Sequence, residues 1–466
     1  DSYKYSHYLQ YPANVVNMYE YAEARSIENY EKMLFVGLYG ILKEYFTTKI
    51  TTEDVEEAAM YAKYHGEPFN YNGFMKIVNE YDGFFPVTIK AIPEGLVIPN
   101  KTIPFTVELT KNDRDLFWLP SWLETFLMRV WFPVNYATRS YHVKEMLLEM
   151  AKKTTENPNV DYQFHNFSSR GTNTVEGAAI GGFAHLTCFK GTDNFSALKY
   201  AHEIYNEPLE SIAWSISATE HSTMSSEGRY GEFNVLDRHL ENNKFSKFPI
   251  AAVGDTYDMY NFTDVATSGK FKEKIESDDY PKLILRPDSD DPRIVIPKML
   301  DIMEKNKVKF TENSKGYKSF NKYGGIWGDG IKMNSIRDIC SLLIMNGYET
   351  NVFAFGSGGW LASSHTRDLM GFAIKCSELT FMDGSTMDIY KDPITDPGKK
   401  SKKGKVTTYF NKETSEFFTD IIGKDTETII NIVQPLFING KMVKDYTLSK
   451  IRESVDNQLA GNQYEF

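Results

Sequence analysis

The sequence predicts an α/β fold with a barrel of parallel strands and a second, smaller β-rich α+β domain. Between residues 160 and 360, five apolar runs each end in a cluster of Gly, Arg, Asp or Ser. Helical patterns alternate with these runs, as repeated βα units require. Elsewhere, short β runs broken by proline and glycine indicate a partly antiparallel sheet. We therefore expect a β-rich domain of residues 1–145 plus 380–466 and a barrel domain of residues 146–379.

The first 145 residues mix helices with short strands. Apolar residues at helical spacing predict helix over residues 30–65, and the acidic residues 53–57 open its second segment. Ser121 and Glu124 have the spacing of a capping box, which predicts the start of a buried helix that joins the two domains. Strands are expected at residues 87–92, 96–98, 105–109 and 428–433.

The five apolar runs of the barrel region predict one shared pocket. They end in residues 164–170, 253–258, 285–289, 327–330 and 355–359. Parallel strands covered by helices read as continuous apolar runs, and right-handed crossovers place the helices outside. In parallel α/β barrels the loops at the carboxyl ends of the strands build the active site. Helices are expected at residues 196–205, 293–304 and 335–345.

The composition is that of an ordinary globular protein, with 466 residues, 41% hydrophobic and 25% charged. A net charge of −11 argues against a general attraction to nucleic acid or to an anionic membrane. No apolar stretch approaches the roughly 20 residues that span a bilayer, and residues 1–5 do not resemble a signal peptide. Three widely spaced cysteines without a CxxC pair favour a cytoplasmic location.

Charged residues of both signs gather at the predicted strand ends. Four acidic and three basic side chains would face one mouth: Asp255, Asp258, Asp288, Asp329, Arg170, Arg286 and Arg367. An arginine beside an aspartate can be a structural ion pair. Arg286 could instead bind a diphosphate in bidentate fashion, while Asp288 accepts from sugar hydroxyls or holds a metal through water. The mixture of signs suits a sugar phosphate with Mg²⁺ better than a bare anion.

Other candidates each have a structural alternative. Residues 356–359, Gly-Ser-Gly-Gly, could cradle a phosphate at the start of a helix that includes residues 366–369, although tight βα turns also use glycine for steric reasons. His221 could be a nucleophile or a phosphate donor, or a histidine satisfied by neighbouring hydroxyls. Phe167 could stack on a heterocycle or pack in a core. The basic segment 396–405 could be a solvated loop or a phosphate contact.

As a set, these motifs resemble the type II phosphoribosyltransferase family, and within it the nicotinamide-specific members. The resemblance runs nearly end to end, through residues 1–4, 165–171, 189–193, 220–223, 286–289, 311–317, 328–330, 356–359 and 401–404. It implies transfer of the phosphoribosyl group of phosphoribosyl pyrophosphate to nicotinamide, which forms nicotinamide mononucleotide and pyrophosphate in NAD salvage. It also implies an irregular α/β barrel paired with a smaller β-rich domain, and a head-to-tail homodimer with active sites at the interface.

The resemblance implies roles for individual residues. Phe167 and Tyr3 of the partner subunit look like the pair that sandwiches the pyridine ring, and Asp193 looks like the acceptor for the carboxamide. A carboxylate at position 193 would repel nicotinate. Arg170, Arg286 and His221 resemble the diphosphate contacts. The ribose and 5'-phosphate contacts would be Asp288, Gly328, Asp329, Gly330, Gly358, Gly359 and Arg367, with Arg25, Lys391 and Lys399 reaching phosphates from the partner or from loops.

The same resemblance implies two cofactors. Mg²⁺ would act on the pyrophosphate without a protein ligand set of its own, and ATP would stimulate turnover by phosphorylating His221. We expect His221, Asp288 and Asp258 to be the catalytic residues. Some positions depart from the usual family pattern: Ser168–Ser169, Gly254, Asp290–Asp291 and Trp360.

Two alternatives remain open at this point. One is a relative that uses nicotinate rather than nicotinamide. The other is a catalytically silent nucleotide-binding or signalling protein. A comparison of turnover with nicotinamide and with nicotinate distinguishes the nicotinate-using relative from the nicotinamide enzyme. Pyrophosphate release distinguishes an enzyme from the silent protein, which would release none.

Overall fold

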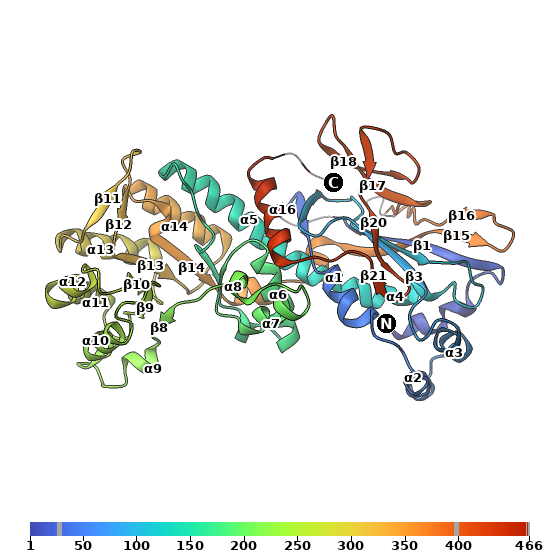
Figure 1. The fold of residues 1–466 in the computed structure, drawn as a ribbon, viewed down its shortest axis with the longest axis horizontal. Helices are drawn as coiled ribbons and strands as arrows, with labels where there is room; N and C mark the ends of the chain where they lie inside the picture. Colours follow the sequence, from blue (N-terminus) through green and yellow to red (C-terminus); the bar gives the residue numbers. More distant parts are fainter. Residues whose placement is uncertain (26–29, 396–399, 463, 465–466) are drawn as a thin grey trace. The chain divides into compact units, whose positions relative to one another are not determined.

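The computed structural model describes residues 1–25, 30–395, 400–462 and 464, and its contacts divide the chain into two compact units (Figure 1). The β-rich unit comprises residues 1–138, 200–208 and 365–466, and the barrel unit comprises residues 139–199 and 209–364. The predicted boundary at 380 assigns residues 365–379 to the barrel, whereas the contacts group them with the β-rich unit. The reason is that β15 (Phe372–Phe381) pairs antiparallel with β1 (Val15–Ala24).

Seven parallel strands form the sheet of the barrel unit, in the order β7-β6-β14-β13-β10-β9-β8. Their bounds are β6 Phe164–Asn166, β7 Gly191–Thr192, β8 Ser217–Ala218, β9 Ile250–Val253, β10 Leu283–Arg286, β13 Tyr323–Trp327 and β14 Phe353–Ser357. Trp214 bridges in parallel to Gly191 on edge strand β7, three residues before β8 begins. The segment 214–218 therefore contacts both edges of the sheet and closes it irregularly, which confirms the predicted α/β fold class.

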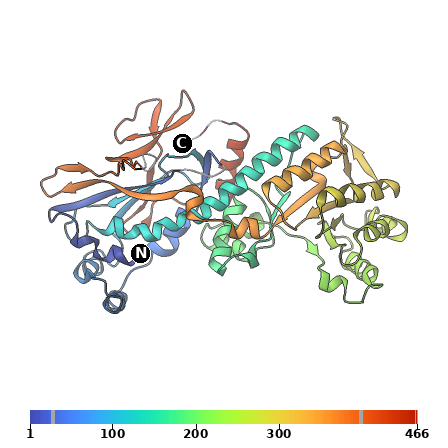
Figure 2. The same cartoon turned by 180° about the vertical axis from the view of Figure 1, so that it is seen from behind.

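Helices follow the strands of this unit as predicted. In both views α13 (Pro292–Lys305) and α14 (Met333–Met345) run alongside the strands (Figures 1 and 2), and their apolar residues are buried. The remaining elements are η4 Ser169–Gly171, α6 Val175–Leu186, α7 Phe195–Glu203, α8 Leu209–Ile212, α9 His221–Met224, α10 Glu232–Asn242, α11 Met259–Ala266, α12 Gly269–Ile275, the hairpin β11 Phe310–Glu312 and β12 Lys318–Phe320, η5 Thr350–Val352 and α15 Gly359–Ser363. The predicted helix over residues 366–369 is a separate turn, because α15 ends at Ser363.

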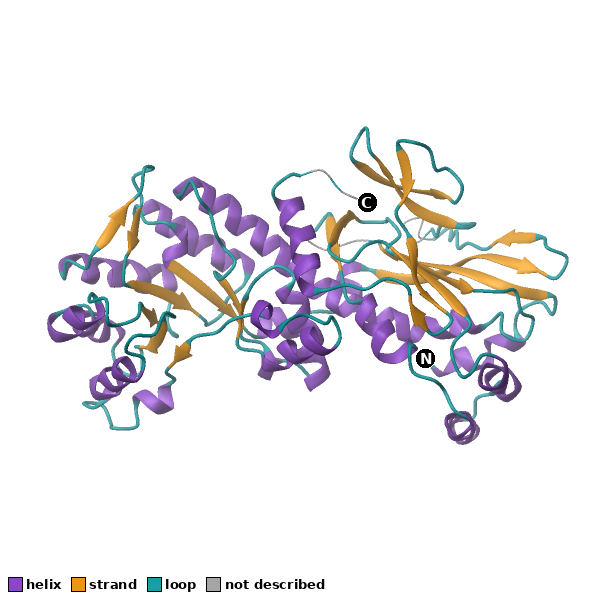
Figure 3. Cartoon of the chain, viewed as in Figure 1, coloured by secondary structure: helices purple, strands orange, loops and turns teal. Residues whose placement is uncertain are grey.

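A seven-stranded sheet organises the β-rich unit, in the order β16-β15-β1-β5-β3-β20-β21 (Figure 3). The strands not yet bounded are β3 Val87–Ala91, β5 Phe105–Leu109, β16 Thr386–Asp388, β20 Gln434–Ile438 and β21 Lys441–Met442. Two smaller sheets join β2 (Lys32–Phe35) with β4 (Leu96–Pro99), and β17 (Val406–Asn411) with β18 (Glu416–Ile421) and β19 (Ile429–Asn431). The strands predicted between residues 87 and 109 and near residue 430 are confirmed.

The elements of the β-rich unit correct the prediction of helix at residues 32–35 and the prediction of a capping box at Ser121 and Glu124. They are η1 Ser2–Leu9, α1 Leu38–Ile41, η2 Leu42–Phe46, α2 Thr52–His65, α3 Tyr71–Glu80, α4 Leu119–Leu127, η3 Met128–Val130, η6 Arg367–Met370 and α16 Leu448–Leu459. Residues 32–35, predicted as helix, form β2, because a short buried apolar run has no periodicity that distinguishes helix from strand. Long helix α5 (Trp131–Thr154) contains the boundary between the units, after residue 138.

The predicted capping box at Ser121 and Glu124 is also wrong. Both residues lie inside α4, whose N-terminal cap is Trp118. The Lys4 ammonium donates to the Ser121 hydroxyl at 3.0 Å and pairs with the Glu124 carboxylate. Ser121 and Glu124 therefore bind a buried lysine of η1, and they do not cap the start of a helix. Within the described residues no helix is both long enough and apolar enough to cross a membrane.

Candidate active site

The parallel register brings the carboxyl ends of the barrel strands to one edge of the sheet. Arg286 pairs with Val253, Trp327 with Phe355, and Ser357 with Asn166. The residues that come after these strands are therefore neighbours in space, although up to about 190 positions separate them in the chain. All five predicted run ends lie at this edge.

Arg286 and Asp288 form an ion pair at the end of β10. One terminal nitrogen of the guanidinium donates to both carboxylate oxygens of Asp288, at 3.0 and 2.9 Å. About a quarter of each side chain remains exposed. The Nε atom of Arg286 is buried and has no hydrogen-bond partner among the described residues, whereas the exposed part of the side chain can meet an anion.

Phe167 reaches this ion pair by packing across two glycines. The Arg286 guanidinium carbon lies 6.0 Å from the centre of the Phe167 ring. A Cβ atom on Gly356 would lie 2.0 Å from the ring, and one on Gly328 would lie 3.2 Å from an Asp288 oxygen and 3.7 Å from the ring. At Gly356 only glycine leaves room for the ring, whereas a side chain at Gly328 would make tight contact with Asp288. The glycines thus shape the pocket beside Phe167.

A cavity of about 570 Å³ runs into the barrel beside these residues. Phe167, Asp193 and Arg286 line one part of it, and Lys282, at the opposite end of β10, lines another. Burial lowers the pKa of Lys282 below its ordinary value, with the nearby Glu349 carboxylate opposing that shift. The cavity has room for a flat heterocycle, and the Phe167 ring supplies an aromatic surface in it.

Asp193 is held in the cavity wall by two contacts. The Ser215 hydroxyl donates to Asp193 Oδ1 at 2.6 Å, and the Asp193 amide donates to the Asn166 carbonyl at 3.0 Å. His165 lies beside it with Nε2 2.9 Å from the Tyr162 carbonyl, so that nitrogen carries the proton. Burial lowers the pKa of His165, and the Asp193 carboxylate works against that shift. His165 is thus a neutral neighbour of Asp193.

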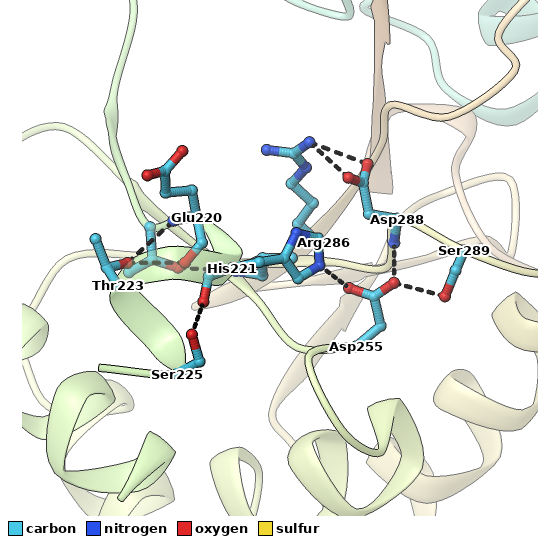
Figure 4. A network of polar contacts seen from close by, with 10 residues as sticks. Glu220, His221, Thr223, Ser225, Asp255, Arg286, Asp288 and Ser289 are labelled. Carbon is cyan, nitrogen blue, oxygen red and sulfur yellow. Dashed lines mark hydrogen bonds and ion pairs between the residues drawn. The ribbon is translucent and has the colours of Figure 1, made fainter. Parts of the chain in front are cut away.

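Asp255 connects the two halves of the polar network (Figure 4). Its Oδ1 lies 3.0 Å from His221 Nε2, and its Oδ2 accepts from the Asp288 amide at 3.2 Å and from the Ser289 hydroxyl at 2.6 Å. The Asp255 side chain is 8% exposed, whereas His221 is half exposed. The histidine therefore presents an open ring edge while a buried carboxylate fixes its orientation.

Asp258, expected to be catalytic, caps a helix in this structure. Its Oδ1 accepts from the amides of Tyr260 and Asn261, both at 3.0 Å, at the start of α11. Asp255, three residues earlier, is the carboxylate that contacts His221. An aspartate placed directly before a helical pattern is a typical N-cap, and this signal was available in the sequence. The partnership of Ser215 with Asp193 had no comparable signal.

The remaining predicted barrel residues border the same edge. Arg170 and Asp329 have exposed side chains, and Gly330 adopts a left-handed conformation with φ of 62°. A Cβ on Gly171, next to Arg170, would be 3.9 Å from backbone atoms of Gly358 and Gly359. The loop after β6 and the glycine-rich loop after β14, residues 356–359, are thus in contact.

Four predicted contacts belong to the β-rich unit: Tyr3, Arg25, Arg367 and Lys391. Tyr3 is 53% exposed on η1, Arg25 pairs with Glu23 at 3.1 Å, and Arg367 pairs with Asp368 at 3.1 Å. The predicted phosphate contact Lys399 lies outside the described residues. The four described residues are not among those that the barrel unit brings together.

Of the departures from the family pattern, Gly254 is explained by local packing. A Cβ on Gly254 would lie 2.4 Å from the Phe262 ring and 2.9 Å from Met259 Sδ, so a serine at this position does not fit. Asp290 has φ of 71°, a conformation that favours glycine, and Asp291 caps α13 by accepting from the Arg293 amide at 2.9 Å. The buried Ser168 donates to Asn166 Oδ1 at 2.6 Å in the loop after β6.

Within the described residues, no group of three His, Cys, Asp or Glu side chains is arranged to hold a metal ion. Asp288 and Asp329 are carboxylates in the loops that follow β10 and β13. One or two carboxylates suit Mg²⁺ that is bound mainly by the phosphates of a substrate. The donor set therefore fits a cation that arrives with its ligand.

Comparisons with known proteins agree along the whole chain. Residues 162–444 match the sequence model of the nicotinate phosphoribosyltransferase (NAPRTase) family, and residues 1–89 match that of the nicotinamide phosphoribosyltransferase N-terminal domain. The nicotinamide phosphoribosyltransferase of Xanthomonas campestris pv. campestris (strain 8004) is 36% identical over 98% of this chain and 97% of its own length. That of Acinetobacter baylyi is 28% identical over 98% of this chain and 96% of its own length.

Solved structures share the fold at low sequence identity. Nicotinate-nucleotide pyrophosphorylase from Pyrococcus furiosus aligns with a TM-score of 0.59 and 17% identity, covering 97% of this chain and 91% of that structure. Human nicotinic acid phosphoribosyltransferase aligns with a TM-score of 0.55 and 12% identity, covering 99% and 93%.

Proposed function

The chain belongs to the nicotinate phosphoribosyltransferase (NAPRTase) family, and we propose that it transfers the phosphoribosyl group of phosphoribosyl pyrophosphate to nicotinamide. The products are nicotinamide mononucleotide and pyrophosphate, in the salvage of NAD. One observation carries the choice of base: Asp193 lines the same cavity as Phe167 and Arg286. The chain is a phosphoribosyltransferase, and this cavity is where its base would bind.

The chemistry of the cavity favours an amide over an acid. The Phe167 ring offers a face on which a pyridine can stack. The Asp193 carboxylate accepts from a carboxamide N–H, whereas it repels the carboxylate of nicotinate. Ser215 donates to one oxygen of Asp193, which leaves the other oxygen for the substrate. The same contacts therefore bind one base and disfavour the other.

The phosphate contacts are assigned to the residues at the strand ends. We propose that Arg170, Arg286 and His221 bind the diphosphate, and that Asp288, Asp329 and the glycines at 328, 330, 358 and 359 bind the ribose and its 5'-phosphate with Arg367. Attack by the pyridine nitrogen displaces pyrophosphate at the anomeric carbon. The nitrogen of neutral nicotinamide has a free lone pair, so no general base is needed. Positioning and electrostatic stabilisation of the leaving group supply the catalysis.

Mg²⁺ is proposed as the cation that accompanies the pyrophosphate group. Asp288 and Asp329 are the residues that would contact it, directly or through water. When bound, it neutralises charge on the leaving pyrophosphate. Removal of divalent cations with a chelator should abolish turnover, and full activity in its presence would contradict this proposal.

The direct test measures both products with purified protein. With Mg²⁺, phosphoribosyl pyrophosphate and nicotinamide, we expect equimolar nicotinamide mononucleotide and pyrophosphate. Nicotinate should be used at least about tenfold less efficiently, because like charges in one site are costly. A preference for nicotinate would support the acid-specific alternative. Absence of pyrophosphate release with either base would support a silent nucleotide-binding protein.

ATP stimulation through His221 is a separate proposal. The half-exposed ring can receive a phosphoryl group while Asp255 holds Nε2. Incubation with ATP labelled on its γ-phosphate should label the wild-type chain and leave the His221→Ala variant unlabelled. Equal labelling of both proteins would place any phosphorylation elsewhere.

We further propose a homodimer in which Tyr3 completes the partner's site. Tyr3→Ala and Arg286→Ala variants should each be weakly active alone. Coexpressed in equal amounts, half of the dimers would pair one of each, and about a quarter of all sites would be intact. Activity that stays at the level of the separate variants would show that Tyr3 does not act across subunits.

A cytoplasmic location is proposed from the cysteines. Cys188, Cys340 and Cys376 are all free thiols, as expected in a reducing compartment. Fractionation of cells that express the chain tests this, and recovery in a membrane or secreted fraction would contradict it.

A further inference from the structure

Arg139, in the middle of α5, is buried against the short helix that comes after the glycine-rich loop. Its side chain is 5% exposed. The guanidinium donates to the Trp360 carbonyl, to the Ser364 hydroxyl at 2.7 Å and to the Ser364 carbonyl at 3.3 Å. The guanidinium carbon also lies 4.4 Å from the centre of the Trp360 ring. All of these residues belong to the barrel unit.

These contacts stabilise a helix that is too short to be stable alone. Helix α15 has five residues, and isolated helices need roughly 12 to 15 to form in water. Its C-terminal carbonyls lack partners within the helix. A guanidinium at this end supplies donors and complements the negative pole of the helix. The planar guanidinium donates to the carbonyls of Trp360 and Ser364 and also stacks on the Trp360 ring.

Trp360 provides the other half of this arrangement. In the family that the sequence resembles, glycine is common at this position, and glycine offers no ring for the arginine. The tryptophan is partly exposed, so it is not an ordinary core residue. Its carbonyl also accepts from the Ser364 hydroxyl at 2.7 Å. The pairing of Arg139 with Trp360 therefore explains the departure from glycine.

The glycine-rich loop lies directly before this anchored helix. The Ala362 amide donates to the Gly358 carbonyl at 3.0 Å, which joins the first turn of α15 to the loop. On the other side, the Ser357 carbonyl accepts from the Phe167 amide at 3.0 Å. The loop is thus held between the loop after β6 and the helix that Arg139 anchors.

We propose that Arg139 is a positioning residue that fixes the backbone of the glycine-rich loop, with Trp360 as its stacking partner. The inference rests on the proposed function in assigning the 5'-phosphate of phosphoribosyl pyrophosphate to this loop. Arg139 itself touches neither substrate. It acts by keeping the amides of Gly358 and Gly359 in the orientation that an anion requires.

The test compares four variants of the full chain. Arg139→Met removes the charge and the fork, and Trp360→Gly removes the ring while keeping a residue that the family tolerates. Arg139→Lys keeps only the charge, and Arg337→Met is the control, because Arg337 is exposed on α14. Steady-state kinetics are combined with hydrogen exchange of peptides that cover residues 355–364.

Arg139→Met and Trp360→Gly should raise the KM for phosphoribosyl pyrophosphate about tenfold, with the KM for nicotinamide unchanged and kcat within about twofold. Amides of residues 357–363 should exchange about tenfold faster in both variants and as in wild type in Arg337→Met. Arg139→Lys should recover little of the wild-type KM and exchange protection, because lysine lacks the planar fork of donors. The effects of the two substitutions should be less than additive in the double variant.

Unchanged exchange over residues 357–363 in Arg139→Met would overturn the proposal, as would a loss of thermal stability with substrate KM values unaltered. If the wild-type protein forms no nicotinamide mononucleotide, the proposed function fails, while the exchange comparison still decides whether Arg139 fixes the loop. Should Arg139→Met not fold, Trp360→Gly gives the same comparison, since it alters only a partly exposed side chain.

Discussion

Asp193 is the residue that we propose selects the base, and its surroundings show how it could do so. It lies in the wall of a cavity beside the Phe167 ring, where a bound base would displace water and so weaken the screening of its charge. Its hydrogen bond from Ser215 fixes the carboxylate without neutralising it. A negative charge in this position interacts differently with a carboxamide and a carboxylate.

Replacing Asp193 with Asn should therefore relax the selectivity. The side chain of Asn keeps an acceptor and adds a donor that can meet a carboxylate, so the ratio of kcat/KM for nicotinamide over nicotinate should fall at least about tenfold. The measurement is turnover of the two bases under identical conditions. Ser215→Ala is the matched control, because it removes the 2.6 Å hydrogen bond but leaves the charge. An unaltered amide preference in Asp193→Asn would refute this explanation of selectivity.

Neighbouring carboxylates take different roles according to the element that begins after them in the chain. Asp258 is occupied by two amides at the start of α11, whereas Asp255 is buried beside His221. Both residues are candidates from the sequence. They differ because Asp258 directly precedes helix α11 and caps it, whereas Asp255 does not. At position 254 the chain has glycine where the family often has serine, because Phe262 and Met259 fill the space that a side chain would need.

At the scale of elements, glycines at the strand ends decide how closely the loops approach the substrate. Gly356 lies at the end of β14 beneath the Phe167 ring, and Gly328 comes directly after β13, beside Asp288. Neither glycine has the left-handed backbone that favours glycine, and contact distance requires glycine at Gly356, where a Cβ would lie 2.0 Å from the Phe167 ring. Gly356 therefore leaves the space that the Phe167 ring occupies.

Gly356→Ala tests this directly. The added carbon would overlap the Phe167 ring at 2.0 Å, so the ring or the strand must shift. Displacement of a substrate-positioning group by about 1 Å can cost roughly a hundredfold in rate, and we expect kcat/KM for nicotinamide to fall by at least about tenfold. Gly171→Ala serves as the control, because its new carbon meets only ordinary contacts at 3.5 to 3.9 Å. Equal activity of the two variants would exclude this role for Gly356.

At the scale of the whole molecule, stability depends on Glu94, a buried carboxylate of the β-rich unit. Glu94 is 3% exposed and accepts from the amides of Gly37 and Tyr39, both at 2.8 Å, and from the Tyr205 hydroxyl at 3.0 Å. These bonds tie residues 37–39, 94 and 200–208 together within the β-rich unit. Burial raises the pKa of Glu94 to about 7, with the hydrogen bonds opposing the shift.

This pKa predicts a pH dependence of unfolding. An acid whose folded pKa lies above its unfolded value of 4.5 binds its proton more tightly when folded. Stability should therefore be greatest below about pH 4.5 for this group and fall as the pH rises to about 7, by on the order of 3 kcal/mol. Glu94→Gln, in which the amide can donate to Tyr205, should remove that decline. Urea midpoints at pH 5 and pH 8 measure it, and parallel pH slopes in both proteins would contradict it.

The amino-acid sequence determined the kinds of element and the chemistry at their ends. Continuous apolar runs, each ending in glycine, arginine or aspartate, are enough to predict buried parallel strands with functional loops. Periodicity failed where a run was short, as at residues 32–35, and the capping-box spacing of Ser121 and Glu124 failed because a buried Lys4 uses both side chains. Local patterns carry no information about a partner that lies far away in the chain.

Only the tertiary structure decided which polar groups meet. It placed Asp255 rather than Asp258 against His221, Ser215 against Asp193, and Arg139 beneath Trp360. It also assigned residues 365–379 to the β-rich unit, because β15 pairs with β1. The physical reason is that strand order and register bring distant residues together, whereas sequence patterns report only the neighbours along the chain.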